Sequence, residues 1–237
     1  MPPCEMSPSF DSVTWDRLGE VYGQHANHPA WGGLVNAHNG IAYRFWAAVA
    51  ADKRFAGSFS LAGPRCEEEE ALFSFFYNAV GSIECALYGL HHLGAISIGL
   101  GFPISKDGDL RAINRRTVRE RFERAFPGEP LTIAIGKVLD DRTFARLLEF
   151  RDVLTHRGSV PRNHRVTMRE PNIARIPEDV DAVFLPAKPK SSSDETLMEL
   201  DTKTTSTLLV WLAQAQRSIL GETLRFAEQR LTTKAKS

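Results

Sequence analysis

Hydrophobic positions repeat at helical spacing along most of the chain, most regularly between residues 67 and 97. Four glutamates, Glu67 to Glu70, open this stretch, where carboxylates stabilise the positive end of a helix dipole. Apolar residues then recur at steps of three or four, at Leu72, Phe76, Ala79, Ile83, Leu87, Leu90 and Leu93. This spacing places them on one face of a helix of about seven turns. We therefore expect residues 67–97 to form the core helix of a bundle.

Weaker patterns of the same kind predict helices on both sides of this core helix. They cover residues 11–24, 30–56, 112–126, 141–158 and 194–231. The apolar stretch 131–138 is too short to decide between helix and strand. The fold class expected from this pattern is all-α, as a single helical-bundle domain over residues 1–237.

Residues 159–195 differ from the rest, because prolines are frequent and leucines are few. Two short runs within them, 165–168 and 182–185, have the composition of strands. We expect an irregular excursion or a small β-hairpin here, inserted into the bundle.

Charge is balanced, with 29 basic and 29 acidic residues, so no global field attracts nucleic acid or a membrane. Any polyanion binding must come from a local patch. The first six residues lack the basic and apolar segments of a signal peptide, and polar residues interrupt the most apolar window, 71–98. The three cysteines, Cys4, Cys66 and Cys85, have neither metal nor disulfide spacing. These features favour a cytoplasmic protein with no membrane segment.

Candidate chemistry gathers at the end of the predicted helix 141–158, which Gly158 and Pro161 terminate. Arg151 projects into the middle of this helix's apolar stripe, which is costly unless the guanidinium is paired or borders a cleft. Asp152 and His156 are spaced i,i+4 and share the adjacent edge of the helix. A cation, a carboxylate and an imidazole at one helix end make a plausible catalytic site.

Two basic runs flank these residues in the sequence. The predicted helix 112–126 carries several arginines, but Glu120 and Glu123 are interleaved with them, which favours a solvated face over a phosphate-binding patch. Arg157, Arg162 and Arg165 follow the candidate site directly and are expected to contact the phosphate backbone of a nucleic acid. The histidine pairs His25/His28 and His91/His92 lack a third ligand for zinc, so we expect neither metal nor cofactor.

The segment from Phe150 to Gly158, with Arg151, Asp152 and His156 in an Arg-x4-His arrangement, resembles the signature of the HEPN superfamily (higher eukaryotes and prokaryotes nucleotide-binding domains). The resemblance is concentrated in about a dozen residues, and the long helix 67–97 also looks like that family's core helix. It implies a HEPN-like α-bundle that dimerises around helix 141–158 and binds RNA, as a metal-independent endoribonuclease or as a binding protein only. Toxin–antitoxin and defence roles would be the family's usual settings.

Carried over residue by residue, the resemblance implies that Arg151 holds the scissile phosphate and that His156 transfers a proton. Asp152 would orient His156 or stabilise its charged form. These residue types also suit attack by a ribose 2′-OH on independent grounds. Such an attack needs a base near neutrality and a cation for the developing phosphorane charge. A 2′,3′-cyclic phosphate would be the product.

Two other interpretations stay open. In the first, Arg151 forms only a structural salt bridge with a buried glutamate such as Glu84, while Thr155 and His156 cap the helix end. Alternatively, the same face serves a non-catalytic helical module for dimerisation or for binding a protein partner. Glu84 and Tyr88, spaced i,i+4 on the core helix, are the residues expected to reach Arg151 across the bundle as a second shell.

Overall fold

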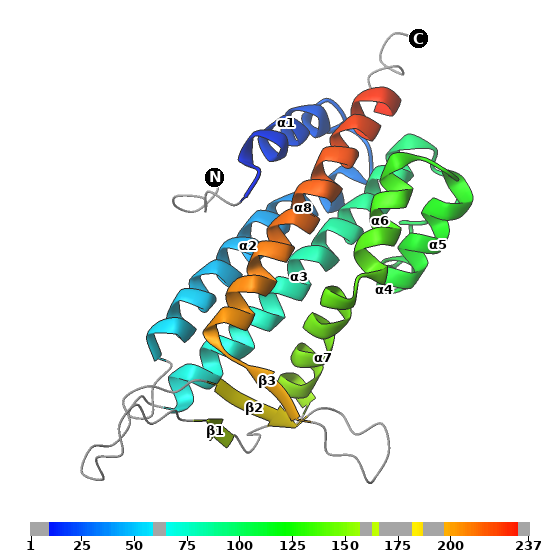
Figure 1. Cartoon of the computed structure of the whole chain (residues 1–237). Helices are drawn as coiled ribbons and strands as arrows, with labels where there is room; N and C mark the ends of the chain where they lie inside the picture. Colours follow the sequence, from blue (N-terminus) through cyan, green and yellow to red (C-terminus); the bar gives the residue numbers. More distant parts are fainter. Residues whose placement is uncertain (1–9, 59–64, 157–162, 166–181, 187–196, 232–237) are drawn as a thin grey trace, which may run out of the picture.

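The computed structural model describes residues 10–58, 65–156, 163–165, 182–186 and 197–231. Within these residues the chain forms eight helices and three short strands (Figure 1). The helices are α1 (Ser12–Gly23), α2 (Trp31–Ser58), α3 (Arg65–Ser97), α4 (Asp107–Arg111), α5 (Arg115–Ala125), α6 (Pro130–Asp140), α7 (Arg142–His156) and α8 (Thr202–Leu231). The expected all-α class therefore agrees with a mostly helical chain. No helix in the ranges given is long and apolar enough to cross a membrane.

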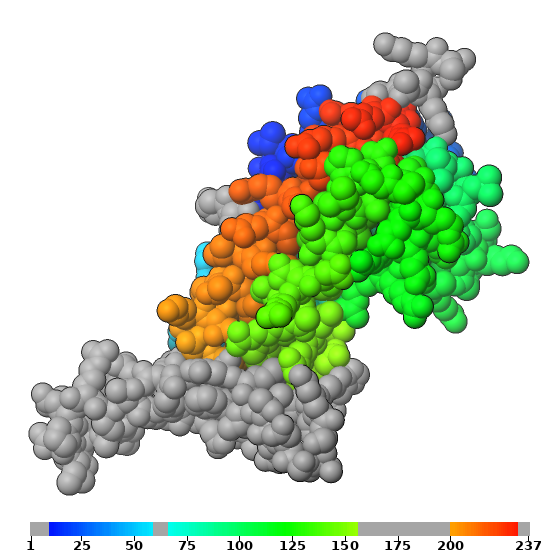
Figure 2. Space-filling view, turned by 45° about the vertical axis from the view of Figure 1, so that its right-hand side comes forward, coloured from blue at the N-terminus to red at the C-terminus, as the bar shows by residue number. Residues whose placement is uncertain are grey.

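The long helices α2, α3 and α8 run side by side and form the body of the bundle (Figure 1). Helix α1 packs across α8 and α2, and α7 lies along one half of α3. The short helices α4 to α6 gather at the end of the bundle away from the strands. On the face seen in Figure 2, α6 and α7 (green) lie against α8 (orange to red).

Helix α3 is the core helix that its hydrophobic pattern predicts. Its apolar face is buried from Ala71 onward, and every residue from Gly89 to Ser97 is buried. Glycines let α2 approach it closely. A Cβ at Gly40 would lie 2.9 Å from the Cys85 Sγ, and a Cβ at Gly33 would lie 2.3 Å from the His92 ring. The α2–α3 pair is therefore held at a separation that side chains at these two glycines would prevent.

Helix α7 is fixed at its start and along its buried face. The Asp141 carboxylate accepts a hydrogen bond from the Thr143 backbone N–H (2.7 Å) and another from Trp211 Nε1 of α8 (3.0 Å). Phe150 is fully buried and stacks on Phe76 of α3, with ring centroids 4.7 Å apart. These contacts set the rotation of α7 about its axis and turn Arg151, the next residue, toward α3.

Three strands form a small antiparallel sheet in the order β1 (Asn163–Arg165), β2 (Ala182–Pro186), β3 (Leu197–Leu200). In this register His164 pairs with Val183, and Phe184 pairs with Glu199. Residues 182–185 of the expected excursion thus lie in β2 and Arg165 in β1. The remainder of 159–195, apart from residues 163, 164 and 186, lies outside the described residues.

Several element boundaries differ from the sequence predictions. The last helix begins at Thr202 rather than near residue 194, because Asp201 caps it: the Thr204 backbone N–H donates to the Asp201 carboxylate at 2.6 Å. The four residues before Asp201 are strand β3. The undecided stretch 131–138 is helical, as part of α6, with Pro130 at its first position, where a missing N–H costs nothing.

Candidate functional site

Arg151 lies at the centre of a polar cluster between α7 and α3. Its Nη1 donates to Glu84 Oε1 at 3.0 Å, while Nε and Nη2 donate to Asp152 Oδ1 at 3.3 and 3.0 Å. Burial lowers the pKa of Arg151, but the hydrogen bond to Asp152 and the attraction of Glu84 outweigh it and raise the pKa above its ordinary value. Arg151 is therefore a fixed cation.

The Arg151 side chain borders an open pocket and is 22% exposed. The pocket has a volume of about 350 Å³, within the range of ligand sites. It is lined by Asn36, Ala37, Arg44, Tyr77, Gly81, Glu84, Cys85, Tyr88 and Arg151, from α2, α3 and α7. The Arg151–Glu84 pair is thus solvent-accessible rather than sealed in the core, since the Glu84 side chain is 43% exposed.

A second pocket of about 320 Å³ adjoins the first, because Glu84 and Tyr88 line both. Its far wall is the start of α5, with Ile113, Asn114 and Arg115. Arg115 Nη1 lies 4.0 Å from Glu84 Oε1, the same oxygen that accepts from Arg151. We call the two pockets together the Arg151 groove.

Cations outnumber carboxylates in this groove. Arg44, Arg115 and Arg151 line it, whereas Glu84 is the one carboxylate in its walls among the described residues. Asp152 adds a second carboxylate behind Arg151. The arrangement leaves an excess of positive charge next to two tyrosines, Tyr77 and Tyr88. Guanidinium forks suit phosphate oxygens, and tyrosine rings suit sugars and bases.

The structure brings together four of the residues singled out from the sequence. Glu84 contacts Arg151 directly rather than through another side chain, Tyr88 lines the groove beside them, and Asp152 accepts from Arg151. His156 is the last residue of α7. The side chain of His156 lies outside the described part of the structure.

The three predicted RNA-backbone arginines are placed only in part. Arg165 is the last residue of β1, and its side chain lies outside the described residues. Arg157 and Arg162 lie outside them altogether. Their expected role as backbone contacts therefore stays a prediction.

Sequence reasoning missed Arg44 and Arg115 as members of the groove. Arg44 reaches across α3 because Gly81 has no side chain: a Cβ there would lie 2.8 Å from Arg44 Nη1. The isolated arginine among apolar residues 41–49 was the available signal. Arg115 is held by Phe144 of α7, with its Cζ 5.8 Å from the ring centroid.

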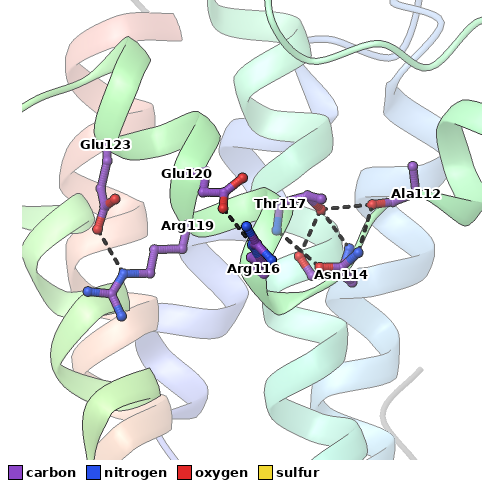
Figure 3. A network of polar contacts seen from close by, with 7 residues as sticks. All are labelled: Ala112, Asn114, Arg116, Thr117, Arg119, Glu120 and Glu123. Atoms are coloured by element: carbon purple, nitrogen blue, oxygen red, sulfur yellow. Dashed lines mark hydrogen bonds and ion pairs between the residues drawn. The ribbon is translucent and has the colours of Figure 1, made fainter.

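Two other arginines of α5, Arg116 and Arg119, are paired with carboxylates (Figure 3). Arg116 pairs with Glu120 at 2.7 Å and Arg119 with Glu123 at 2.8 Å, and Arg119 also pairs with Asp140 at 2.6 Å. Asn114 caps the helix by accepting from the Thr117 N–H at 3.0 Å. This pairing supports the solvated-face interpretation for these arginines.

The adjacent histidines of α3 lie inside the bundle. His91 Nε2 donates to the Pro103 carbonyl at 3.0 Å, and its Nδ1 accepts from Arg121 Nη1 at 2.9 Å. The His92 ring nitrogens are buried without a hydrogen-bond partner among the described residues. Within the same residues, no three His, Cys, Asp or Glu side chains gather as a metal site would require.

Comparison of the chain with models of known protein families, with curated proteins and with solved structures found no match.

Proposed function

We propose that this protein is a HEPN-like RNA-binding protein whose Arg151 groove holds the phosphate backbone of an RNA strand. The observation that carries the proposal is the placement of Arg151, which is tethered by Asp152 yet exposed to an open groove between two further arginines. An ion pair that only stabilises the fold does not require a 350 Å³ pocket beside it, nor neighbouring arginines that outnumber the carboxylates.

Glu84 occupies the position where a phosphate oxygen would bind. It accepts from Arg151 Nη1 and lies 4.0 Å from Arg115, so it marks the point between the two guanidinium groups. A phosphodiester that enters the groove displaces Glu84 and restores two charge-assisted contacts. Asp152 stays in place, because it accepts from Arg151 on the opposite side of the guanidinium, through Nε and Nη2.

The proposal extends to metal-independent cleavage through the 2′-OH in a homodimer. His156 follows Arg151 by five residues, about 7.5 Å along the helix axis. In this reaction the His156 imidazole comes within hydrogen-bond reach of the 2′-OH and takes its proton, while Arg151 stabilises the charge on the phosphorane and the 5′-oxygen leaves as the 2′,3′-cyclic phosphate forms. A second copy of α7 is expected to contribute the other half of the site.

Equilibrium binding of a fluorescent single-stranded RNA tests the proposal. Arg151→Gln is expected to weaken binding about tenfold or more, because it removes a charge-assisted contact to phosphate. Arg142→Gln is the matched control, since it removes the same charge from an exposed position on the same helix. Equal affinities of wild type and Arg151→Gln would refute the proposal.

Cleavage has a separate test. Wild-type protein in EDTA is expected to cut RNA to products that end in a 2′,3′-cyclic phosphate, and Arg151→Gln and His156→Ala are each expected to abolish the cut. Size-exclusion chromatography with light scattering reports whether the active form is a dimer. Cleavage that persists in both variants would come from another site or a contaminant.

A second candidate is a protein-interaction module, favoured by apolar exposure at the turn after α3. Leu100 is 88% exposed there between Gly99 and Gly101, both of which have positive φ. If wild type binds no RNA, and Leu100→Asp converts a dimer to a monomer, this function replaces the first.

A further inference from the structure

Helix α3 has one open face, and aromatic side chains lead along it into the Arg151 groove. Phe73 and Tyr77 are both exposed, at 42% and 45%, although most of the helix is buried. Tyr77 also lines the groove wall. Phe73 lies about 16 Å from Glu84 along the helix axis, since 11 residues separate them.

The two rings form a stacked pair rather than isolated exposed side chains. Their centroids lie 5.8 Å apart and their planes differ by 10°. Residues at i and i+4 on a helix share one face, so both rings present themselves along the same line. We call Phe73 and Tyr77 the aromatic ledge.

A cation lies at the junction between the ledge and the groove. The Arg44 guanidinium carbon is 5.2 Å from the centroid of the Tyr77 ring, and Arg44 also lines the groove. An aromatic platform with an adjacent guanidinium is the combination that binds single-stranded nucleic acid: the rings stack on bases and the cation follows the backbone.

The ledge ends where negative charge begins. One turn before Phe73, Glu70 is exposed and lies 3.6 Å from Arg54, and Glu67 is exposed one turn further back. Carboxylates repel a phosphate backbone, so they limit the ledge to the length of its two rings.

We propose that the aromatic ledge is a base-stacking subsite for single-stranded RNA, which fixes the strand beside the phosphate held in the Arg151 groove. This inference rests on the proposed function and adds its substrate class. A base would stack on an outer face of this pair, because the inner faces of the two rings cover each other. Bases paired within a duplex keep their faces stacked on each other, so the ledge selects single strands.

Binding of a short oligoadenylate that carries 2-aminopurine tests the ledge, with affinity, base fluorescence and oligomeric state measured together. The variants are Tyr77→Leu, which removes the ring, and Tyr77→Phe, which keeps it. Ile133→Ala is the control, because it removes an exposed apolar side chain from α6, outside the groove. A duplex of the same length is the competing substrate.

Tyr77→Leu is expected to weaken single-strand binding about tenfold and to abolish the fluorescence change on binding. Tyr77→Phe is expected to keep the fluorescence change, because it keeps the ring. Ile133→Ala is expected to behave as wild type, and the duplex to bind more weakly than the single strand. Wild-type affinity in Tyr77→Leu, or equal binding of single strand and duplex, overturns the ledge. A loss of affinity in Tyr77→Leu that results only from dissociation of a dimer also overturns the ledge, because the two rings would then contact a second copy of the protein rather than RNA.

The failure of the ledge is distinguishable from the failure of the proposed function. If wild type binds RNA in an Arg151-dependent way and Tyr77→Leu has no effect, only the ledge is refuted. If Arg151→Gln has no effect on binding, the proposed function is refuted, and the subsite is refuted with it.

Discussion

At the scale of single residues, the Arg151 guanidinium is shared between two carboxylates with different surroundings. Asp152 is the next residue after Arg151 in the sequence, whereas Glu84 belongs to another helix and lies 67 positions away. The Glu84 side chain is also the more exposed of the two, at 43% against 31%. Glu84 is therefore the carboxylate that an incoming anion replaces.

Glu84→Gln is expected to strengthen RNA binding by roughly three- to tenfold, because it removes a charge that repels phosphate and competes for Arg151. The measurement is the dissociation constant at fixed salt concentration. Glu120→Gln is the control, since that glutamate pairs with Arg116 on the surface of α5. An unchanged or weaker affinity in Glu84→Gln would show that phosphate does not bind at the Glu84 position.

The sequence predicts part of this residue-scale arrangement. Helical angles alone place Arg151 on the apolar side of α7, and the i,i+4 spacing of Glu84 and Tyr88 nominates them as its neighbours. The structure brings Glu84 to Arg151 and Tyr88 to the groove. The bond between Arg151 and Asp152 was not foreseen, because it depends on a side-chain rotamer that spacing does not determine.

At the scale of elements, glycines control how α2 and α3 pack. Gly33, Gly40 and Gly81 each leave space for a side chain of the neighbouring helix, namely His92, Cys85 and Arg44. The sequence shows glycines in both predicted helices, where they weaken helix formation. It does not show which glycine faces which partner, because that depends on the packing register of two helices, and the paired residues are 37 to 59 positions apart in the sequence.

Gly33→Ala is expected to lower the free energy of unfolding by about 1–3 kcal/mol, because a Cβ would lie 2.3 Å from the buried His92 ring. Gly32→Ala is the matched control on the same helix turn, where a Cβ meets nothing within 4 Å. Helix propensity makes that control neutral or stabilising. Urea denaturation compares the two, and equal midpoints would contradict the packing described for α2 and α3.

Some element boundaries are determined by nearby residues in the sequence, and others depend on contacts with distant residues. The starts of α5 and α8 follow from local caps, Asn114 and Asp201, each of which accepts from a backbone N–H three residues on. The helical periodicity of residues 194–201 nevertheless suggested an earlier start for α8. Pairing of β3 with β2 takes residues 197–200 into a sheet, and such long-range pairing is not visible in a local pattern.

At the scale of the whole molecule, the bundle buries histidines that stay neutral. Burial lowers the pKa of both His38 and His92 to about 4. His38 stacks on Trp15 with ring centroids 4.4 Å apart, and burial also lowers the pKa of His91. The three rings lie on the two central helices, so protonation of any of them would place a charge inside the core and destabilise it.

Stability is expected to fall as the pH drops from about 6.5, the ordinary histidine pKa, to about 4. In that range the unfolded chain binds protons that the folded chain does not, so acid favours unfolding. The loss from His38 and His92 is on the order of a few kcal/mol. Urea unfolding at a series of pH values measures it.

His38→Phe is expected to reduce this pH dependence, because it keeps an aromatic ring against Trp15 and removes the titrating group. The relevant quantity is the slope of unfolding free energy against pH between about 4 and 6.5. A slope that is the same in His38→Phe and wild type would contradict the assignment of the effect to His38.

The class of the whole molecule was predictable, and the composition of its groove was not. Repeating apolar positions establish a helical bundle with α3 at its centre, and the resemblance at Arg151 to His156 directs attention to one helix end. Arg44 and Arg115 join Arg151 only after α2, α5 and α7 pack around α3. A groove made by four helices has no local signature in any of them.

A crystal structure of the protein with a short single-stranded RNA is the most direct measurement of the central claim, that the Arg151 groove binds the RNA backbone. The account predicts a phosphate oxygen in place of Glu84 as the acceptor from Arg151 Nη1, with the Arg151–Asp152 bond retained. RNA bound elsewhere on the surface, with the Arg151–Glu84 pair intact beneath an empty groove, would contradict it.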